Sequence, residues 1–590
     1  MDIFGILTML GGLALFLYGM QVMGDGLSKA SGGRLERILE KLTSNPIKAV
    51  LLGAGVTAVI QSSSATTVMV VGFVNSGIMK LSQTVGIIMG ANIGTTATAW
   101  ILSLSGLEGD NFFVRMLKPS SFSPVLAVIG VCFIMFAKKD RLKDIGSVMV
   151  GFAILMFGMD TMSGAVKPLA DVPEFAGILT MFSQPILGLL AGAVFTAIIQ
   201  SSSASVGILQ ALSATGAITF GTAIPIIMGQ NIGTCVTALL SGIGANKNAR
   251  RASLIHLYFN IVGTTIFMLV FYSANSVMHF EFVNGSVNAA GIAVVHSIFN
   301  VTATVILLPF SKGLERLAYM TIKEDTEADV KDRTKAQEFK LLDPRFLDTP
   351  GFAIEQCRLV MLRMGEVAKE SFIKATELID NFSEEKAKEV EELEDMVDRY
   401  EDELGTYMVK LGQKRLSEKE NTTLSLMLHC LNDFERISDH AVNICESTRE
   451  IHEKNVDFSK KAQEELKIFT AATREVLENT LEVFGRQDYE GAFYIEPMEE
   501  VVDYLKTELK QRHIKRLRKG KCTIEMGFIL SDISTNYERV SDHCSNIAIC
   551  LMESKENGYE AHGYLDRLRA ADDAKFRTKY EEYMKKYALP

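Results

Sequence analysis

Two short polar stretches in apolar surroundings combine residue types that can bind small ions. The first begins at Gln61 and the second at Gln200, 139 residues later, and in each the amide is followed by three serines. A hydroxyl group can donate to an anion or accept onto a hard cation, and an amide can do both. In lipid such side chains are costly unless they line a cavity or meet partners, which makes them functional candidates. The residues expected to contact ions are Gln61, Ser62, Ser63, Ser64, Thr66, Thr67, Gln200, Ser201, Ser202, Ser203 and Ser205.

A second pair of stretches recurs at the same spacing, which indicates an internal duplication. Residues 90–96 read GANIGTT and residues 229–235 read GQNIGTC, and the register holds without insertion from about residue 12 to residue 99 of the first copy. These stretches could form a second helix break that supports or binds ions. Alternatively, their glycines could serve close helix packing. The candidate residues are Asn92, Thr95, Asn231 and Thr234.

The composition divides the chain into two parts of different character. Residues 1–310 hold 16 of the 60 basic and 12 of the 70 acidic side chains, and the remainder lie in residues 311–590. The first part is therefore predicted to lie in a membrane, and the second to be a soluble, acidic domain. The acidic balance gives no indication of nucleic-acid binding.

Seven apolar segments approach the roughly 20 residues that are needed to cross a bilayer. They are about 3–23, 83–104, 119–137, 146–165, 218–240, 254–275 and 287–310. The serine-rich stretches differ, because each lies between two apolar arms of about 14 residues that reach only roughly 21 Å apiece. We expect two re-entrant hairpins, each with its break deep in the membrane; the alternative is two complete spans per hairpin.

Charge in the loops predicts that the two copies face opposite sides of the membrane. Basic residues gather after the first span, at residues 138–143 and at residues 247–251. These loops are assigned to the cytoplasm, and the acidic loops near residues 108–110, 171–174 and 281 to the outside. Three crossings separate the copies, so the repeat is inverted, and inverted repeats with broken helices are typical of transporters.

The expected domains are a transmembrane domain over 1–310, with repeats of about 1–140 and 141–310, and a linker over 311–350. A helical bundle over 351–556 and a charged tail over 557–590 follow. Amphipathic periodicity in the third region predicts long helices and no strands, so the fold class is all-α. The expected helices are 354–379, 383–411, 417–451, 459–485, 489–519 and 523–553.

A broken helix offers free N–H groups at the start of one arm and free carbonyls at the end of the other. The first attract anions and the second attract cations. Two breaks that meet on a pseudo-twofold axis would form a site for a small oxyanion and alkali cations. Because no Lys or Arg lies in either stretch, co-bound cations would have to neutralise the anion. The alternative is that the hydroxyls bond back to their own helices.

The paired serine stretches, the paired GxNIGT stretches and the inverted halves resemble the type II sodium–phosphate cotransporter family over residues 1–310. The resemblance implies sodium-driven phosphate symport, with substrate and sodium held between the two serine stretches. The second copy departs from the first at Val206, opposite Thr67, and at Cys235, opposite Thr96. Ion sites in the two halves are therefore not expected to be equivalent.

A different duplication, with an offset of 103 residues, lies in the soluble part. Oxygen-bearing side chains recur every four residues and thus form one stripe on each of two helices, a pattern that suits hard metal cations. The predicted ligands are Glu435, Asp439 and Asn443, with Glu538, Asp542 and Asn546; Glu394 and Asp398 share the spacing. A solvated face is the alternative. These motifs resemble the PhoU family of helical bundles, which implies metal binding and regulation of phosphate uptake.

Two further helix starts share the pattern His-x-x-Phe-Asn, at His256 to Asn260 and at His296 to Asn300. The His and the Asn lie on one helix face at this spacing. They could form a proton-sensitive gate or an interhelical hydrogen bond.

The sequence as a whole predicts a sodium:phosphate symporter of the cell membrane with a cytoplasmic regulatory domain. Its expected partners are inorganic phosphate, sodium ions, the lipid bilayer, metal ions of unknown identity, and a second copy of the chain or a phosphate-signalling protein. Phosphate export, or sensing without net transport, are the rival functions. No nucleotide-binding loop or nucleophile elbow suggests an enzyme.

Overall fold

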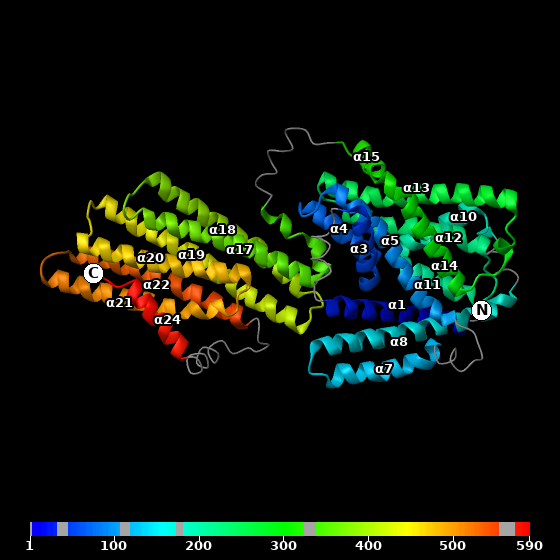
Figure 1. Ribbon diagram of the computed structural model, residues 1–590, viewed down its shortest axis with the longest axis horizontal. Helices are drawn as coiled ribbons and strands as arrows, with labels where there is room; N and C mark the ends of the chain where they lie inside the picture. Colours follow the sequence, from blue (N-terminus) through cyan, green and yellow to red (C-terminus); the bar gives the residue numbers. More distant parts are fainter. Residues whose placement is uncertain are drawn as a thin grey trace. The chain divides into compact units, whose positions relative to one another are not determined.

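The computed structural model describes residues 3–31, 45–106, 118–172, 177, 181–323, 338–553 and 573–590. The chain divides into two compact units, Met1–Phe352 and Ala353–Pro590. Both units are helical (Figure 1). Among the described residues the extended pairing is limited to an isolated antiparallel bridge between Thr219 and Ser286. The all-α prediction is confirmed.

The first unit contains most of the apolar helices. Among the described residues, six helices are long and apolar enough to cross a membrane. The seventh expected span, α7, is not one of these six. It has 18 residues and is the shortest of the seven expected spans. The helices are α1 (Ile3–Ser31), α3 (Pro46–Ile60), α4 (Ser63–Asn75), α5 (Leu81–Ser103), α7 (Pro119–Phe136), α8 (Asp140–Val166), α10 (Pro185–Ile199), α11 (Ser202–Ser213), α12 (Phe220–Ser241), α13 (Lys247–Met278), α14 (Ala289–Leu307) and α15 (Ser311–Thr321).

The serine-rich stretches form the two predicted hairpins. The arms α3 and α4 have 15 and 13 residues, and α10 and α11 have 15 and 12. At 1.5 Å per residue each arm reaches about 18–22 Å, less than the hydrocarbon thickness of about 30 Å. Each second arm packs against the other copy, α4 on α12 and α11 on α5. The hairpins therefore interlock the two halves of the unit.

The contact between α1 and α8 shows the inverted symmetry directly. A Cβ built on Gly12 would lie 3.1 Å from the carbonyl oxygen of Gly158, and one built on Gly151 would lie 3.0 Å from that of Gly19. The contacts run antiparallel, and exchanging each residue for its counterpart 139 positions away converts one contact into the other. A twofold relation between the repeats produces this pattern.

The ends of the two hairpins lie beside loops of opposite predicted sidedness. At the end of α4, the Asn75 side chain accepts a hydrogen bond of 2.8 Å from the N–H of Asn246, beside the basic start of α13. Beyond α11, the N–H of Val287 donates to the carbonyl oxygen of Ile218 over 2.8 Å, next to the loop that carries Glu281. The first set of loops was predicted to be cytoplasmic and the second to be external. The loops around Arg34, Glu108 and Glu174 lie outside the described residues.

The glycines of the repeated GxNIGT stretches position the outer arm of each hairpin. A Cβ on Gly90 of α5 would lie 2.0 Å from the carbonyl oxygen of Val50 in α3, and one on Gly229 of α12 would lie 2.0 Å from that of Leu189 in α10. Only glycine allows helices to approach this closely. The helix-packing alternative therefore accounts for these glycines.

The expected linker over 311–350 is more ordered than its polar composition suggested. It begins with α15, which buries Leu314 and Ala318 one turn apart. Arg251 fastens this helix to α13, because its Nε and Nη2 donate to the carbonyl oxygen of Ile322 over 2.9 and 2.7 Å. The other described part, residues 338–352, belongs to the first unit. The apolar residues Phe346, Leu347 and Phe352 were too few to reveal this packing in a charged stretch.

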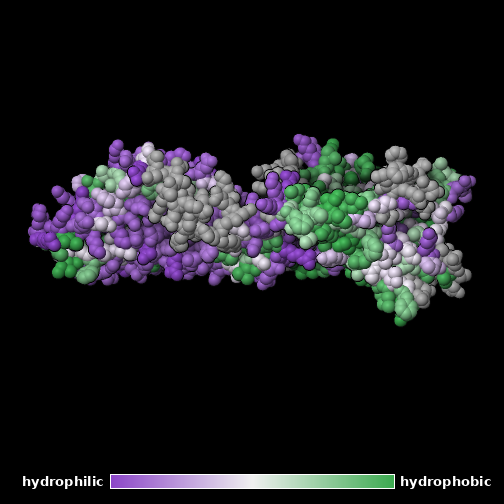
Figure 2. Space-filling model, turned by 90° about the horizontal axis from the view of Figure 1, so that it is seen from below, coloured by the Kyte–Doolittle hydropathy of each residue, from purple (hydrophilic) through white to green (hydrophobic). Residues whose placement is uncertain are grey.

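The second unit is a bundle of long helices with a hydrophilic surface, whereas apolar side chains cover much of the first unit (Figure 2). Its helices are α17 (Pro350–Glu377), α18 (Glu384–Gly412), α19 (Glu418–Glu453), α20 (Lys460–Arg486), α21 (Glu496–Arg518), α22 (Ile524–Glu553) and α24 (Asp573–Lys586). The predicted helix at 489–519 starts later, because Asp488 accepts a bond from the Gly491 N–H and forms a turn. Of the expected tail, residues 557–572 lie outside the described residues.

The glycine contacts make a testable prediction for α3. A Cβ on Gly53 would lie 2.2 Å from the carbonyl oxygen of Ile87, whereas nothing lies within 4 Å of one on Gly55. We expect Gly53→Ala to destabilise the protein by about 1–3 kcal/mol, because the arm must move off α5. The matched variant Gly55→Ala should leave stability unchanged or raise it. Thermal unfolding of the detergent-solubilised full chain measures both, and equal midpoints would contradict the packing role of Gly53.

Candidate functional site

The two serine-rich breaks have the same local structure. Gln61 and Gln200 end their helices in the left-handed conformation, with φ of 60° and 57°. The next residue begins the second arm as its N-cap: the Ser62 hydroxyl accepts from the Ala65 N–H over 3.1 Å, and the Ser201 hydroxyl accepts from the Ala204 N–H over 3.2 Å. A non-glycine residue with positive φ is strained, and such strain is concentrated at functional sites. Its presence in both copies marks the breaks as built features.

A hydroxyl pair joins the two arms of each hairpin. Thr57 donates to Thr66 over 3.0 Å, and the equivalent Thr196 donates to Ser205 over 2.8 Å. Thr66 and Ser205 thus have structural partners, although sequence analysis placed them in the ion-contacting set. The pair fixes the angle at which the second arm leaves the break.

The remaining serines lie at the first turn of each second arm. Ser63 and Ser64 open α4, and Ser202 and Ser203 open α11. The first amides of a helix have no partner within the helix, and they carry its partial positive charge. Ser63, Ser202 and Ser203 are buried. Each break therefore presents N–H groups and hydroxyls in the membrane part of the unit, which is the arrangement that binds an oxyanion.

The two glutamines differ in their surroundings. Gln61 is buried, and its Oε1 accepts a bond of 2.9 Å from the Thr98 hydroxyl of α5, while its Nε2 donates to the carbonyl oxygen of Ala58. Gln200 has an exposed side chain. The residue equivalent to Thr98 in the second copy is Thr237, whose buried hydroxyl has no hydrogen-bond partner among the described residues. The break is duplicated, but its side-chain network is not.

Several other candidate hydroxyls bond back to their own helices. Thr67 donates to the carbonyl oxygen of Ser63 over 2.8 Å, Thr95 to that of Ala91 over 3.0 Å, and Thr234 to that of Gln230 over 2.9 Å. Asn92 does the same through Nδ2, over 3.3 Å to the carbonyl oxygen of Ile88. A hydroxyl that donates to a carbonyl still has lone pairs for a cation. These hydroxyl oxygens can therefore bind a cation, but the hydroxyls cannot also donate a hydrogen bond to an anion.

Asn231, unlike Asn92, belongs to a network between helices. Its Nδ2 donates to Asn300 of α14 over 3.3 Å, and its Oδ1 lies 3.4 Å from Nε2 of His296. On α13, Asn260 donates to Cys235 over 3.3 Å. The His-x-x-Phe-Asn motifs therefore make interhelical contacts, as the structural alternative proposed.

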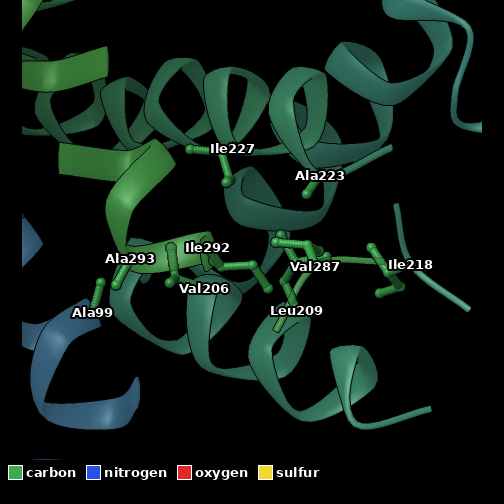
Figure 3. Close-up of a cluster of buried hydrophobic side chains, with 9 residues drawn as sticks. All are labelled: Ala99, Val206, Leu209, Ile218, Ala223, Ile227, Val287, Ile292 and Ala293. Atoms are coloured by element: carbon green, nitrogen blue, oxygen red, sulfur yellow. The ribbon is translucent and has the colours of Figure 1, made fainter. Parts of the chain in front are cut away.

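An unforeseen glutamine secures the second hairpin. Gln210 is buried, and its Nε2 donates to the carbonyl oxygens of Ala99 in α5 and Ala289 in α14, over 3.0 and 2.9 Å. Around it, Val206 and Leu209 of α11 pack against apolar side chains of α5, α12 and α14 (Figure 3). The counterpart of Gln210 in the first copy, 139 residues earlier, is the apolar Val71, so the repeat gave no signal for this anchor.

The second unit gathers predicted carboxylates into two clusters. In the first, Glu435 and Asp439 of α19 face acidic residues of α18, and burial together with Asp439 raises the pKa of Glu435 to about 7. Burial and Asp398 also raise the pKa of Glu394. Carboxylates held this close in a partly buried place need a cation or protons. The first carboxylate cluster comprises Glu394, Asp398, Glu401, Glu435 and Asp439.

The second cluster is the counterpart of the first. Glu499, Asp503 and Asp542 place one carboxylate oxygen each within 4.8 Å of one another, and so do Glu496, Glu499 and Glu500. Burial, then Glu496, raises the pKa of Glu499 to about 9, and burial with Glu538 raises the pKa of Asp542 to about 6. Sequence analysis missed Glu499 and Asp503. They lie 105 residues after Glu394 and Asp398, two positions out of the 103-residue register, so only their shared spacing of four residues could have revealed them.

The two asparagines of the predicted metal sets have other partners. Asn546 donates to Asp433 over 3.2 Å, and Asn443 donates to Asn536 over 3.4 Å. Nδ1 of His543 lies 2.8 Å from Oδ1 of the same Asp433, and Nδ1 of His440 lies 2.8 Å from Oδ1 of the same Asn536. These contacts, related by the 103-residue offset, join α19 to α22. Asn443 and Asn546 therefore take part in helix pairing through Nδ2, and their Oδ1 atoms remain candidates for cation binding together with the carboxylates.

Comparison with known proteins covers both units. The model of the Na+/Pi-cotransporter family matches residues 15–164 and 154–293, and the PhoU domain model matches residues 361–448 and 467–551. A solved PhoU from Pseudomonas aeruginosa aligns to 35% of this chain and 97% of its own, with 18% identity and a TM-score of 0.33.

Two curated relatives share sequence with this chain over very different lengths. The putative inorganic phosphate export protein YjbB of Escherichia coli K12 is 28% identical, over 74% of this chain and 76% of its own length. The rat sodium-dependent phosphate transport protein 2A is 38% identical, over 16% of this chain and 15% of its own. The duplicated breaks and the two acidic clusters lie within the regions that the family models match. The first unit therefore matches the Na+/Pi-cotransporter family over residues 15–293, and the second unit matches the PhoU domain twice.

Proposed function

We propose that the chain is a sodium-coupled transporter of inorganic phosphate whose transport site lies between its two interrupted hairpins. One observation carries the proposal: both breaks end one arm at a left-handed glutamine and begin the next with a serine cap. Each break is followed by a helix start that bears further serine hydroxyls, on Ser63 and Ser64 in α4 and on Ser202 and Ser203 in α11. Amide and hydroxyl donors from two such starts match the oxygens of a tetrahedral anion.

Charge neutralisation supports coupling to a cation. Within the described breaks, residues 60–67 and 199–206 contain no Lys or Arg that could balance a phosphate. Neutral oxygens are available instead, among them the hydroxyls of Thr67, Thr95 and Thr234, which have lone pairs to spare. Hard oxygen ligands suit an alkali ion. Co-bound sodium would supply the charge, as the name of the rat relative suggests.

The transport cycle follows from the inverted repeat. Each second arm packs on the opposite copy, so tilting one half against the other opens the breaks to one side at a time. The gradients then decide the net direction. Uptake by symport is the first candidate. Export is the second, because the relative that matches 74% of the chain is named a putative phosphate export protein.

The second unit is proposed to be a cytoplasmic regulator that holds metal ions. Loops rich in Lys and Arg and the end of the first hairpin lie on the side predicted to be cytoplasmic, and the chain leaves the first unit near them at residues 343–352. The second carboxylate cluster fits a divalent cation, because one oxygen each of Glu499, Asp503 and Asp542 lies within 4.8 Å of the others, and burial, then neighbouring carboxylates, raises the pKa of Glu499 to about 9. Glu496, Glu499, Asp503 and Asp542 would hold the ion in the second cluster.

Removing the first-turn hydroxyls tests the transport site. Ser63→Ala combined with Ser202→Ala deletes one donor from each break and leaves the caps Ser62 and Ser201 in place. We expect sodium-dependent uptake of labelled phosphate into proteoliposomes to fall about tenfold or more, since a hydrogen bond to a charged group contributes about 1.5–3 kcal/mol.

The control is Thr265→Val, which removes an exposed hydroxyl of α13 that donates to its own helix over 2.8 Å. It should transport at the rate of the unmodified protein. Vesicles loaded with phosphate, with the sodium gradient reversed, measure export by the same proteins. Unchanged rates in the double variant, in both directions, would place the substrate elsewhere.

The raised carboxyl pKa values predict how stability depends on pH. Folding raises the pKa of Glu499 from 4.5 to about 9 and that of Glu435 from 4.5 to about 7. Between pH 5 and 8 the folded state therefore binds more protons than the unfolded state, and the stability that these groups contribute is lost as pH rises. With a chelator present, we expect the unfolding temperature of the second unit to fall across this interval. Mn²⁺ should raise it more at pH 8 than at pH 6.

Glu499→Gln should reduce both the pH dependence and the shift caused by Mn²⁺. The matched change Glu482→Gln, at an exposed partner of Arg486, should alter neither. Thermal scans of the full-length protein at fixed ionic strength provide the comparison. A Mn²⁺ response that survives in Glu499→Gln would remove this cluster as the metal site.

A further inference from the structure

The segment that precedes the second unit is bound to the first hairpin. Residues 342–352, called here the strap, include the short helix η6 (Pro344–Asp348). Asn75, at the end of α4, donates from Nδ2 to Oδ2 of Asp343 over 2.6 Å. The Asp343 side chain has no solvent exposure. A buried carboxylate is costly unless it is paired, so this contact is specific.

Aromatic packing extends the contact along α4. Phe346 and Phe352 of the strap surround Phe73, with ring centroids 5.5 and 4.9 Å from it and 4.8 Å from each other. The Phe346 ring occupies the place of a side chain at Gly72, where a Cβ would come within 2.7 Å of it. All three phenylalanines are essentially buried. The strap therefore fills a site shaped for it.

The strap is bound to the second repeat as well. Arg345 donates from Nε to the carbonyl oxygen of Ser241, the last residue of α12, over 2.7 Å. The same guanidinium pairs with Asp343, also at 2.7 Å. Asn75 in turn accepts from the N–H of Asn246. Through this chain of contacts the strap links α4 of the first repeat to α12 and α13 of the second.

The arrangement exists at only one of the two hairpins. In the second copy, Gly72, Phe73 and Asn75 are replaced by Ala211, Leu212 and Ala214. Neither the space for a ring nor the polar group for a carboxylate is duplicated there. The departure from the repeat indicates that these residues serve the strap and not the transport site itself.

We propose that the strap is an autoinhibitory clamp: it ties the two repeats together at the cytoplasmic end of α4 and so restrains the movement on which transport depends. This inference rests on the proposed function. The N-terminal end of α4 carries Ser63 and Ser64 at the break, and its other end, 13 residues in all, is bound by the strap. A rigid helix can couple its two ends energetically. The helix that leads into the PhoU domains, α17, begins at Pro350 within the strap. A conformational change in those domains can therefore strengthen or break the contacts of the strap with α4 and α12.

Two conservative variants weaken the clamp without opening a cavity. Asp343→Asn removes the charge that pairs with Arg345, and Arg345→Gln removes the bonds to Ser241 and Asp343. We expect each to raise the rate of phosphate transport in proteoliposomes about fivefold, the factor equivalent to one hydrogen bond of about 1 kcal/mol. Arg316→Gln, which removes an exposed charge from α15, should leave the rate unchanged.

Hydrogen exchange of the amides in residues 63–75 gives a readout that does not need transport. Exchange should be faster in Asp343→Asn and Arg345→Gln than in the unmodified chain and in Arg316→Gln. If no protein transports phosphate, the proposed function fails, and the exchange data still decide on the clamp. Variants that leave the exchange of α4 unchanged, or that slow transport, would overturn the proposal.

Discussion

The structure of the first unit depends on interrupting a helix where water cannot solvate the free ends. Two residues achieve this in each hairpin: a glutamine in the left-handed conformation and a serine that caps the next helix. In lipid every unpaired backbone group costs several kcal/mol, so such a break persists only where protein surrounds it. The interlocked arms bury Gln61 at the first break, whereas Gln200 at the second break is exposed. The first amides of a helix have no partner within the helix, and the duplication supplies two such helix starts, at Ser63 and at Ser202.

The helix contacts around the breaks follow from the same constraint. Glycines on α5 and α12 let the outer arms approach within backbone contact, and glycines on α1 and α8 do the same on the symmetry axis. Close approach replaces the hydrophobic effect, which does not favour helix association in lipid. The backbone of the two breaks matches, with φ of 60° and 57°, whereas the side chains of Gln61 and Gln200 have different surroundings. Asymmetry of this kind suits the proposed site, because an anion needs hydrogen-bond donors and a cation needs oxygen ligands.

The sequence predicted those features that repeat or have a period. The offset of 139 residues identified the paired serine stretches, short apolar arms predicted the hairpins, and loop charge predicted their inverted orientation. The helices of the second unit followed from their amphipathic pattern. It did not predict contacts that a single residue makes with a distant partner. Gln210 has an apolar counterpart, Asp343 lies in a charged stretch, and Asp433 belongs to no repeated acidic spacing, yet each forms a buried or half-buried link. The hydroxyls of Thr66 and Ser205 were assigned to ions on residue type alone, whereas packing gave them partners across the hairpin.

The central claim is that the starts of α4 and α11 together bind the transported anion. A cryo-EM map of the full chain in lipid nanodiscs, with sodium and phosphate present, tests it most directly. We expect a compact tetrahedral density within hydrogen-bonding distance of the first-turn amides of both helices, and its loss when sodium is replaced by potassium. A density bound by neither helix start, or unaffected by the removal of sodium, would contradict the claim.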